Sequence, residues 1–410
     1  MTQIELGWGA GPGDDYETIA DRFRPIFAEI ARDANERELN RTLPFEQIRL
    51  LKEAGFGALR LPKDEGGLGV TLPQFFNLLV ELSEADSNVT QALRAHFGFA
   101  EDILNSHDPV RRRVWTARIG RGEIVGSAWS EVGPGAGLDR FATHVSGSNG
   151  HQVLNGAKYY TTGSLYADWI DVGASNVQGE GVSVAVRRHA DGVDIVDDWD
   201  GFGQVLTASG TTTFTNVAVT DDDIVIDEER FRYSSAFYQL YHLATLAGIG
   251  RAITNDVAKA VAERRRSYSH AAATRSSQDP QVLQVVGRIR GAAYSAGAIV
   301  LQAANALQRA FDTRFVNDPD SEEKANAIAE LETAQAQTVV SDLVLQSSTL
   351  LFDALGASAT KKPAGLDRHW RNARTLSSHN PRIYKDRIIG DFAVNGTPPP
   401  YQWRIGQSPT

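Results

Sequence analysis

The chain has 410 residues and a formal net charge of −10, and its 42% hydrophobic and 22% charged residues exclude a disordered or collagen-like protein. It contains no cysteine, so disulfides, zinc–thiolate sites, iron–sulfur clusters and cysteine nucleophiles are excluded as well. The length suffices for roughly two or three domains, and the acidic balance argues against nucleic acid or an anionic membrane as a partner.

The start of the chain favours a cytoplasmic protein. The opening, MTQIELGWGAGPGDD, has neither the basic segment nor the apolar segment of a secretory signal. No stretch reaches the roughly 18 consecutive apolar residues of a membrane-spanning helix. We therefore expect a cytoplasmic location.

Residues 1–122 are predicted to form a helical domain. In the segment PFEQIRLLKEAG, which begins at Pro44, apolar residues recur at helical spacing, and Gly55 is expected to end the helix. A loop rich in glycine and proline follows, and helical patterns resume over about 75–104.

Residues 123–232 are predicted to form a compact antiparallel β domain. Valine, isoleucine, threonine and aromatic residues dominate this segment, as in the run TTTFTNVAV. The pairs Asn149-Gly150 and Asn155-Gly156 are each expected to form a turn between short strands.

Residues 233–410 are predicted to form a helical bundle, because three long alanine-rich patterns keep helical periodicity, over 233–266, 281–315 and 322–355. Asp320 and Glu323 are expected to form a capping box for the third helix, and Gly356 to end it. The order of helices, strands and helices predicts the α+β class.

Searches for common local motifs exclude several site types. The chain has no dinucleotide-binding Gly-x-Gly-x-x-Gly segment after a strand, no phosphate-binding Walker loop, no HExxH pair and no Gly-x-Ser-x-Gly elbow. The nine histidines have no ligand-type spacing, so no metal is expected. Local chemistry alone leaves the function open.

Two segments resemble the flavin-contacting segments of the acyl-CoA dehydrogenase superfamily. The first is Ala128-Trp129-Ser130-Glu131 with the Gly-rich run after it, and the second is LNGAKYYTTGSLYADWI. The resemblance covers about 45–396. It implies an acyl-CoA dehydrogenase-like fold with an N-terminal helical domain, a central antiparallel β domain and a C-terminal four-helix bundle. It also implies a homotetramer in which a neighbouring subunit completes the flavin site.

One departure separates the chain from the dehydrogenases of that superfamily. They need a carboxylate base, but the segment 233–252 has no Glu or Asp, and a histidine, His379, lies in the C-terminal loop. The run from 352 to 390 resembles the flavin-dependent monooxygenases of this fold, including dibenzothiophene-type sulfur monooxygenases. These take reduced flavin from a separate reductase, bind O₂ and form a C4a-(hydro)peroxyflavin.

The resemblance places two histidines at the reactive edge of the flavin. His379 matches a loop histidine that contacts this edge, and an imidazole suits the handling of a proton near neutral pH. His96 matches a helix histidine of the same site, where Ala100 replaces the tyrosine found four residues later. The alternatives are an exposed loop histidine and a packed helix histidine.

Small hydroxyl groups on the two flavin-contacting segments are the next candidates. Thr162 matches the threonine that contacts flavin N5, and Ser130 and Ser164 are assigned to the same site. Trp129 is expected to cover the ring. The alternatives are ordinary turn or strand residues and a core tryptophan.

The flavin phosphate has its own candidates. Arg275 resembles the arginine that binds phosphate across the subunit interface, and a guanidinium suits that role. Ala357 and Ser358 match the segment that completes the phosphate site. Three arginines at helical spacing, Arg368, Arg371 and Arg374, either reach the phosphate or form salt bridges at the subunit interface, and we favour the interface salt bridges.

The sequence therefore predicts the oxygenase component of a two-component flavin-dependent monooxygenase that acts on a small organosulfur or aromatic substrate. Reduced FMN is the favoured cofactor and FAD the alternative, with O₂ as co-substrate and a separate NAD(P)H:flavin reductase as partner. Residues 131–139 are expected to act as a lid over the substrate pocket. Two other readings stay open: an FAD-containing acyl-CoA dehydrogenase, and a non-catalytic scaffold.

Overall fold

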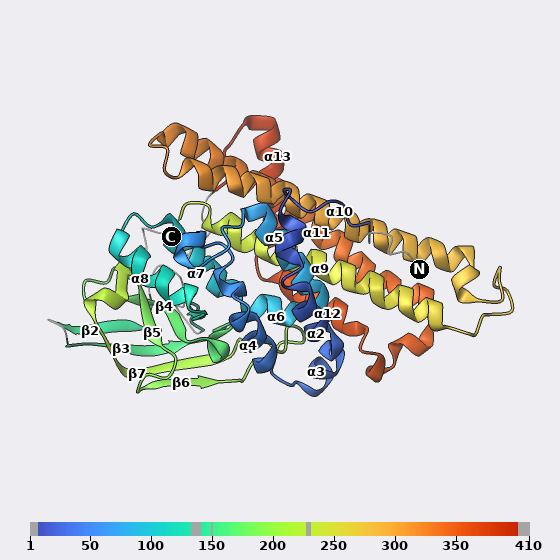
Figure 1. Ribbon diagram of the computed structural model, residues 1–410, viewed down its shortest axis with the longest axis horizontal. Coiled ribbons are helices and arrows are strands. Elements are labelled where there is room, and N and C mark those ends of the chain that lie inside the picture. Colours follow the sequence, from blue (N-terminus) through green and yellow to red (C-terminus); the bar gives the residue numbers. More distant parts are fainter. Residues whose placement is uncertain (1–6, 133–140, 149–150, 227–230, 401–410) are drawn as a thin grey trace.

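The computed structural model describes residues 7–132, 141–148, 151–226 and 231–400. Within these ranges, helices form both ends of the chain and a β-sheet forms the middle. The sheet lies at one end of the molecule, and the long helices extend away from it (Figure 1).

The N-terminal region has short helices around one long central helix, α5. The helices are α1 (Tyr16–Ala20), α2 (Arg24–Arg32), α3 (Ala34–Asn40), α4 (Phe45–Glu53), α5 (Leu72–Ala85), α6 (Ser87–Ala92), α7 (Arg94–Asn105) and α8 (Pro109–Gly120). The helix predicted from Pro44 is confirmed as α4, and Gly55 follows it with a left-handed φ of 77°. A reciprocal capping box between Thr71 and Gln74 fixes the start of α5.

The central strands form a single sheet in the order β6-β7-β3-β2-β4-β5-β8, with β1 paired to β4. The strands are β1 (Val125–Ala128), β2 (His144–Ser148), β3 (His151–Lys158), β4 (Trp169–Ser175), β5 (Gly181–Arg187), β6 (Val193–Val196), β7 (Thr211–Val219) and β8 (Ile224–Ile226). The expected antiparallel sheet is in fact mixed, because β1 pairs in parallel with the first part of β4 and β2 pairs in parallel with β4 at one residue pair.

The expected turn at Asn155-Gly156 is wrong. Both residues lie inside β3, where the pairing with β7 shifts register between Leu154 and Gly156. Gly156 has a φ of 147°, and a side chain on it would collide with Thr143, so the glycine serves a bulge instead of a turn. The other expected turn, Asn149-Gly150, lies outside the described residues.

The C-terminal region confirms the three long helical patterns. Its helices are α9 (Ser234–Glu263), α10 (Pro280–Thr313), α11 (Pro319–Leu355), α12 (Asp367–Ser378) and α13 (Lys385–Asn395). The expected capping residue of α11 is wrong by two positions, because Asp318 caps the helix by accepting the Ser321 N–H at 3.3 Å. Gly356 ends α11 as predicted.

One hydrophobic core joins the two helical regions. It runs from the N-terminal helices through α5 to α9, α10 and α11. At the contact between α5 and α9, the rings of Phe75 and Phe237 stack with centroids 5.9 Å apart. A separate cluster fills the interior of the sheet. The N-terminal helices and the bundle are therefore one packed unit.

Helix α11 is long and apolar enough to cross a membrane by length and composition, with a mean hydropathy of 1.2 in its most apolar window. However, 44% of that window is buried inside the protein, and the helix packs along α9 and α10. A core helix of a bundle has the same properties, so this feature is weak evidence for a membrane span.

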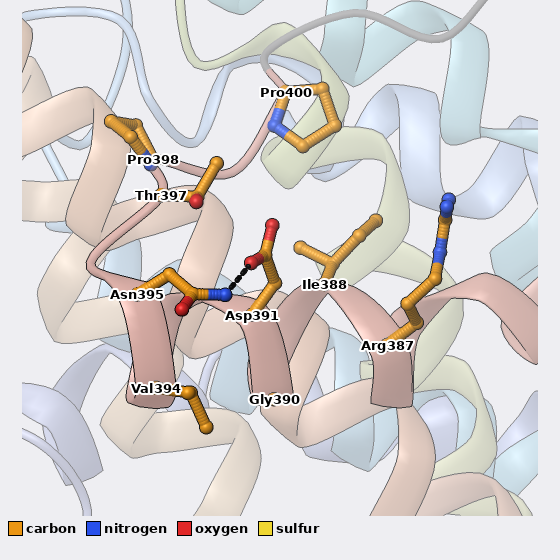
Figure 2. A pocket seen from close by; sticks show the side chains of 9 residues that line it. All are labelled: Arg387, Ile388, Gly390, Asp391, Val394, Asn395, Thr397, Pro398 and Pro400. Atoms are coloured by element: carbon orange, nitrogen blue, oxygen red, sulfur yellow. Dashed lines mark hydrogen bonds between the residues drawn. The ribbon is translucent and has the colours of Figure 1, made fainter.

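A surface pocket of about 600 Å³ lies beside α13 (Figure 2). Its lining includes Arg387, Ile388, Asp391, Asn395 and Pro400. The Asn395 side chain donates a hydrogen bond to Asp391 at 2.7 Å. None of the residues proposed from the sequence for the flavin site lines this pocket.

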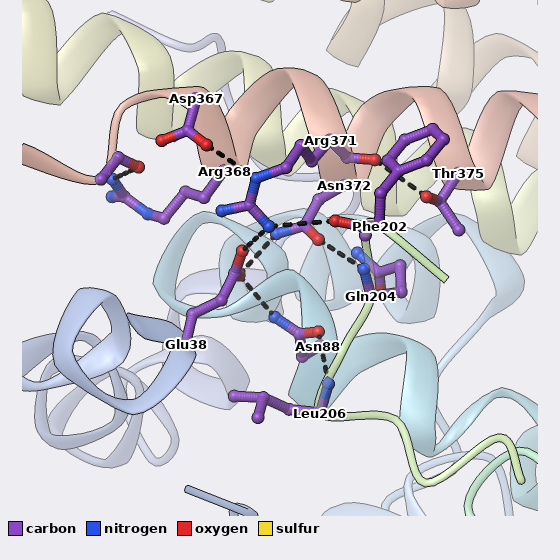
Figure 3. A network of polar contacts seen from close by, with 12 residues as sticks. Glu38, Asn88, Phe202, Gln204, Leu206, Asp367, Arg368, Arg371, Asn372 and Thr375 are labelled. Carbon is purple, nitrogen blue, oxygen red and sulfur yellow. Dashed lines mark hydrogen bonds and ion pairs between the residues drawn. The ribbon is translucent and has the colours of Figure 1, made fainter. Parts of the chain in front are cut away.

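A polar network around Glu38 connects all three regions of the chain (Figure 3). The Glu38 carboxylate accepts hydrogen bonds from Asn372 at 2.7 Å and Asn88 at 3.0 Å, and it lies 3.0 Å from the guanidinium of Arg371. The amide oxygen of Asn372 accepts the N–H of Gln204 at 2.6 Å. Burial raises the pKa of Glu38, although these donors oppose the shift.

We predict that Glu38→Leu lowers the free energy of unfolding by about 3 kcal/mol, because it leaves buried amide donors and a guanidinium without their acceptor. Urea denaturation measures the change. The matched control is Asp367→Asn, which removes the exposed carboxylate that also pairs with Arg371 and should cost less than about 1 kcal/mol. Equal losses in the two variants would contradict the central role of Glu38.

Candidate functional site

His379 follows the last residue of α12, where two neighbours fix its tautomer. Its Nε2 lies 3.5 Å from the Arg94 guanidinium, which can only donate, so Nε2 is the acceptor. Nδ1 therefore carries the proton and donates it to the Asn380 side-chain oxygen at 3.0 Å. Asn380 in turn donates to Gln239 on α9 at 2.6 Å. The imidazole is thus neutral, oriented, and able to accept a proton at Nε2.

The surrounding protein and the Arg94 charge lower the pKa of His379 to about 4. The His379 side chain is nevertheless exposed at the surface of the chain, so burial within one subunit does not fully explain the shift. The charge of Arg94 alone accounts for a lowered pKa of His379, since a cation 3.5 Å away disfavours a second positive charge. His379 is consequently neutral at physiological pH.

A second histidine, His242, lies directly beneath His379. The two ring centroids are 4.4 Å apart. His242 is only 1% exposed, and neither of its ring nitrogens has a hydrogen-bond partner among the described residues. Burial lowers the pKa of His242, and the neighbouring His379 and Arg94 lower it further. Two neutral imidazoles and one guanidinium therefore form a compact cluster.

Thr162 lies in the loop after β3, within a group of three hydroxyls. Its hydroxyl lies 2.7 Å from that of Ser209, which lies 2.8 Å from that of Thr207. The next residue, Gly163, packs so closely on the Ala92 carbonyl that an added Cβ would lie 2.1 Å from it. Because Ala92 ends α6 and Arg94 begins α7, this contact brings Thr162 beside the helix that carries Arg94.

The two segments that resemble flavin-contacting segments lie side by side. The Tyr159 N–H donates to the Ser130 carbonyl at 2.9 Å. The indole N–H of Trp129 donates to Asp171 on β4 at 2.9 Å, and its ring packs over Gly173 of the same strand. Trp129 is half-buried, so its ring is partly accessible beside Ser130.

A buried ion pair anchors the start of the expected lid. Lys158, 1% exposed, lies 2.8 Å from Glu131, and burial lowers the pKa of Lys158 to about 8. Glu131 also accepts the N–H groups of Ala142 and Thr143, which closes the base of the loop. Most of the expected lid at 131–139, namely residues 133–139, lies outside the described residues.

The expectation that His96 faces the flavin does not agree with its environment. His96 is completely buried; its Nε2 lies 2.9 Å from the Gly57 carbonyl oxygen, and its Nδ1 accepts the Val125 N–H at 3.2 Å. Both ring nitrogens are thereby engaged with backbone groups. Burial lowers the pKa of His96 to about 4. Its neutral ring connects α7 to β1 and to the turn at Gly57.

Ser164 is likewise completely buried. Its hydroxyl donates to the Ser127 carbonyl at 3.0 Å, and its backbone packs against Gly126 so closely that a Cβ there would lie 2.5 Å from the Ser164 Cα. The residue therefore joins the loop after β3 to β1. A direct contact with a flavin would require this packing to open.

The candidate phosphate residues form a second group at the far end of the bundle (Figure 1). Arg275 is exposed in the loop between α9 and α10, and Ala357 and Ser358 lie in the turn after α11. Arg264, directly after α9, binds the Leu355 carbonyl at that end. Arg264 is 22 residues beyond His242, and α9 spans all but the last of them, so the two residues are separated by about 33 Å along the helix axis. A single flavin cannot reach both groups within one chain.

Two of the three arginines on α12 form ion pairs within the chain, whereas the favoured salt bridges were expected at a subunit interface. Arg368 lies 2.6 Å from Asp256, and Arg371 pairs with Glu38. Neither is available for a phosphate without breaking an existing pair.

Sequence reasoning missed three residues at this site. Arg94 and His242 carried no signal, since a lone arginine or histidine in a helix is ordinary. Tyr160 could not be foreseen either: its backbone is left-handed, with a φ of 63°, and its side chain is 51% exposed next to Trp199. Backbone strain at an exposed aromatic residue is a frequent property of binding sites.

Comparison with known proteins gives matches along most of the chain. Residues 13–144 match the acyl-CoA dehydrogenase N-terminal domain, and residues 240–381 match the acyl-CoA dehydrogenase C-terminal domain. Together these two matches cover about two thirds of the chain.

Individual relatives are similar over nearly their full length. The chain is 26% identical to a dibenzothiophene monooxygenase of Rhodococcus qingshengii, covering 85% of this chain and 86% of the relative. It is 24% identical to a probable FMNH2-dependent monooxygenase of Pseudomonas putida, covering 92% and 94%. The solved structure of a methanesulfinate monooxygenase of Pseudomonas fluorescens superposes with a TM-score of 0.83 at 24% identity, covering 93% and 98%.

We predict that His96 contributes to acid sensitivity. With a pKa of about 4 in the folded protein and about 6.5 in the unfolded chain, the unfolded chain binds the proton first as the pH falls. Stability is therefore present above pH 6.5 and is lost towards pH 4, by up to about 3 kcal/mol. Urea denaturation of His96→Gln between pH 4.5 and 6 should show a slope reduced by about 1.4 kcal/mol per pH unit.

The control for this experiment is His151→Gln, which alters an exposed histidine on β3. It should leave the pH dependence of stability as in the unmodified protein. A His96→Gln slope equal to that of the control would mean that His96 titrates in the folded protein as it does in the unfolded chain.

Proposed function

The chain belongs to the acyl-CoA dehydrogenase family, as a flavin-dependent monooxygenase of that fold, and on this premise we propose that it oxygenates a small organosulfur or aromatic substrate. The observation that carries the proposal is the neutral His379, oriented by Asn380 and exposed beside Arg94. Such a group holds or transfers a proton at Nε2 during oxygen transfer.

The cofactor is reduced FMN, with O₂ as co-substrate. When bound, reduced FMN supplies the electrons that activate O₂. We propose that Trp129, Ser130, Tyr160 and Thr162 contact its ring, because they lie on the two adjacent loops of the sheet. The hydroxyl of Thr162 fits this role, since its partner Ser209 is itself a hydroxyl and either group can donate.

The phosphate of FMN is proposed to bind Arg275 with Ala357 and Ser358 of a neighbouring subunit. The separation of this group from His379 within one chain supports the assignment, since a second chain must then supply it. We propose a homotetramer, as the resemblance implies; the separation by itself calls only for a second subunit. A separate NAD(P)H:flavin reductase and a cytoplasmic location complete the proposal.

In the proposed mechanism, residues of the site hold a proton acceptor and a hydroxyl in fixed positions. His379 holds a proton acceptor at Nε2 while Asn380 and Gln239 keep its other nitrogen protonated. Thr162 offers a hydroxyl from the loop after β3, and Ser209 fixes its position. His96 acts indirectly, as a positioning residue that holds α7 against β1.

A dehydrogenase would instead need a carboxylate base near the substrate. The first turns of α9 contain no Asp or Glu, and none of the described groups that shift the pKa of His379 is a carboxylate. The nearby buried Glu330 on α11 faces Lys385 and the Ala236 amide, and burial raises its pKa to about 8. The geometry therefore favours oxygen transfer over proton abstraction.

The test of the function is anaerobic mixing of the protein with reduced FMN, followed by an oxygen jump in a stopped-flow spectrometer. A transient spectrum distinct from both reduced and oxidised FMN is expected. Bleaching of bound FAD by acyl-CoA compounds, without such a transient, would establish the dehydrogenase instead. If the protein binds no flavin, a non-catalytic scaffold is the remaining interpretation.

We predict that His379→Ala uncouples the reaction. Without the imidazole, the product formed per reduced FMN should fall by roughly tenfold, and hydrogen peroxide should rise to account for the difference. Peroxide and product are measured together under limiting reduced FMN. His189→Ala, which alters an exposed histidine after β5, is the control, and an unchanged product yield in His379→Ala would refute the assigned role.

We predict that Arg275→Ala weakens FMN binding by about 10- to 100-fold, because a guanidinium–phosphate contact is lost. Fluorescence titration with FMN measures the dissociation constant. Lys259→Ala removes an exposed cation from the last turns of α9 and should leave binding unchanged. Equal effects of the two substitutions would show only a general electrostatic attraction.

A further inference from the structure

Arg94 differs from the well-buried arginines of this protein. Arg37, Arg60 and Arg251, each less than 10% exposed, all face a carboxylate. Arg94 is half-buried and forms no ion pair with any carboxylate among the residues that the structure describes. Its Nε is buried without a hydrogen-bond partner. A guanidinium in this state has unused capacity for an anion.

The surroundings hold Arg94 in place without neutralising it. Its guanidinium lies 5.3 Å from the ring centroid of Tyr238, a cation–π contact. Tyr238 reaches this position because Gly98, one turn along α7, leaves room for the phenol: a Cβ there would lie 2.1 Å from the hydroxyl. On the other side, Arg94 donates to His379 at the long distance of 3.5 Å, which a stronger acceptor can displace.

His242 supplies the second indication of a ligand. Its side chain is buried beneath His379, yet both ring nitrogens lack partners. A buried polar group without a partner costs about 1–3 kcal/mol, so such a group at an active site is expected to meet a ligand or water. A neutral imidazole can donate one hydrogen bond to an oxyanion, which complements the charge of Arg94.

We propose that Arg94, with His242 and His379, binds the negatively charged head of the substrate, and that the substrate is a small organic sulfinate, R–SO₂⁻. The inference rests on the proposed function and makes it more specific, since the relatives differ in whether their named substrates carry a charge. A guanidinium can donate two parallel hydrogen bonds, and the two equivalent oxygens of a sulfinate can accept them.

Among sulfur oxyanions, the lone pair on sulfur decides which anion can accept an oxygen atom. A sulfinate still has a lone pair on sulfur that can accept oxygen, whereas a sulfonate does not. In the reaction, one atom of O₂ forms a new S–O bond to give the sulfonate, R–SO₃⁻. The other atom leaves as water with two protons, and reduced FMN supplies the two electrons and becomes oxidised. Arg94 keeps its charge throughout and retains an oxyanion partner in the product.

The test compares two probes of similar size, methanesulfinate and its neutral analogue dimethyl sulfoxide. Binding of each is measured by calorimetry to the full-length protein, with and without saturating oxidised FMN. The variants are Arg94→Met, which removes the charge, and Arg94→Lys, which keeps it. The matched control is Arg382→Met, because Arg382 lies near His379 in sequence but already pairs with Asp342 at 2.6 Å.

The unmodified protein and Arg382→Met should bind methanesulfinate about 10- to 100-fold more tightly than dimethyl sulfoxide. Arg94→Met should lose that preference without weaker binding of dimethyl sulfoxide, and Arg94→Lys should keep part of it. Equal binding of both probes, binding of neither, or an unaltered preference in Arg94→Met would overturn the inference. So would a loss of FMN affinity alone in Arg94→Met, which would assign the guanidinium to the flavin.

The binding measurement tests the anion site, and the oxygen-jump measurement tests the proposed oxygenase function, so the two can fail separately. If methanesulfinate binds through Arg94 but no oxygen jump yields a flavin transient, the oxygenase function fails and the anion site stands. If the transient forms and only neutral acceptors are oxygenated, the function stands and the sulfinate assignment fails.

Discussion

The buried carboxylate of Glu38 is the constraint on which the arrangement of the three regions depends. It belongs to α3, and its donors come from Asn88 on α6 and Asn372 on α12. The oxygens of the same two amides accept N–H groups from the loop before β7, at Leu206 and Gln204. Each asparagine thus connects a negative charge to the backbone of the sheet region, which satisfies groups that burial would otherwise penalise.

Both branches of this network lead to the candidate site. Asn372 precedes His379 by seven residues, about two helical turns, so fixing Asn372 sets the height and rotation of α12 at the histidine. Gln204 lies five residues before Ser209, whose hydroxyl holds Thr162. Movement of α12 relative to the loop would therefore displace the His379 imidazole relative to the Thr162 hydroxyl. The rigidity of the site comes from a residue far from it in sequence.

The sequence predicted what local patterns determine and failed where distant contacts decide. Helical periodicity defined α4, α9, α10 and α11, because their apolar stripes face one shared core. Asn155-Gly156 was misjudged, since a glycine that permits a turn equally permits a bulge opposite Thr143.

Residue types alone could not assign the histidines. His96 and His242 are both buried helix histidines, but the backbone at Gly57 and Val125 engages one and no described group engages the other. That difference depends on long-range packing. The electrostatics of the site follow from the neutral state of His242 and His379, because it leaves Arg94 as the single positive charge of the cluster. The chain has a net charge of −10 and therefore repels anions overall. Arg94 has no carboxylate partner among the described residues, so its charge attracts an anion locally. An unpaired Arg94 therefore favours a negatively charged ligand at this cluster.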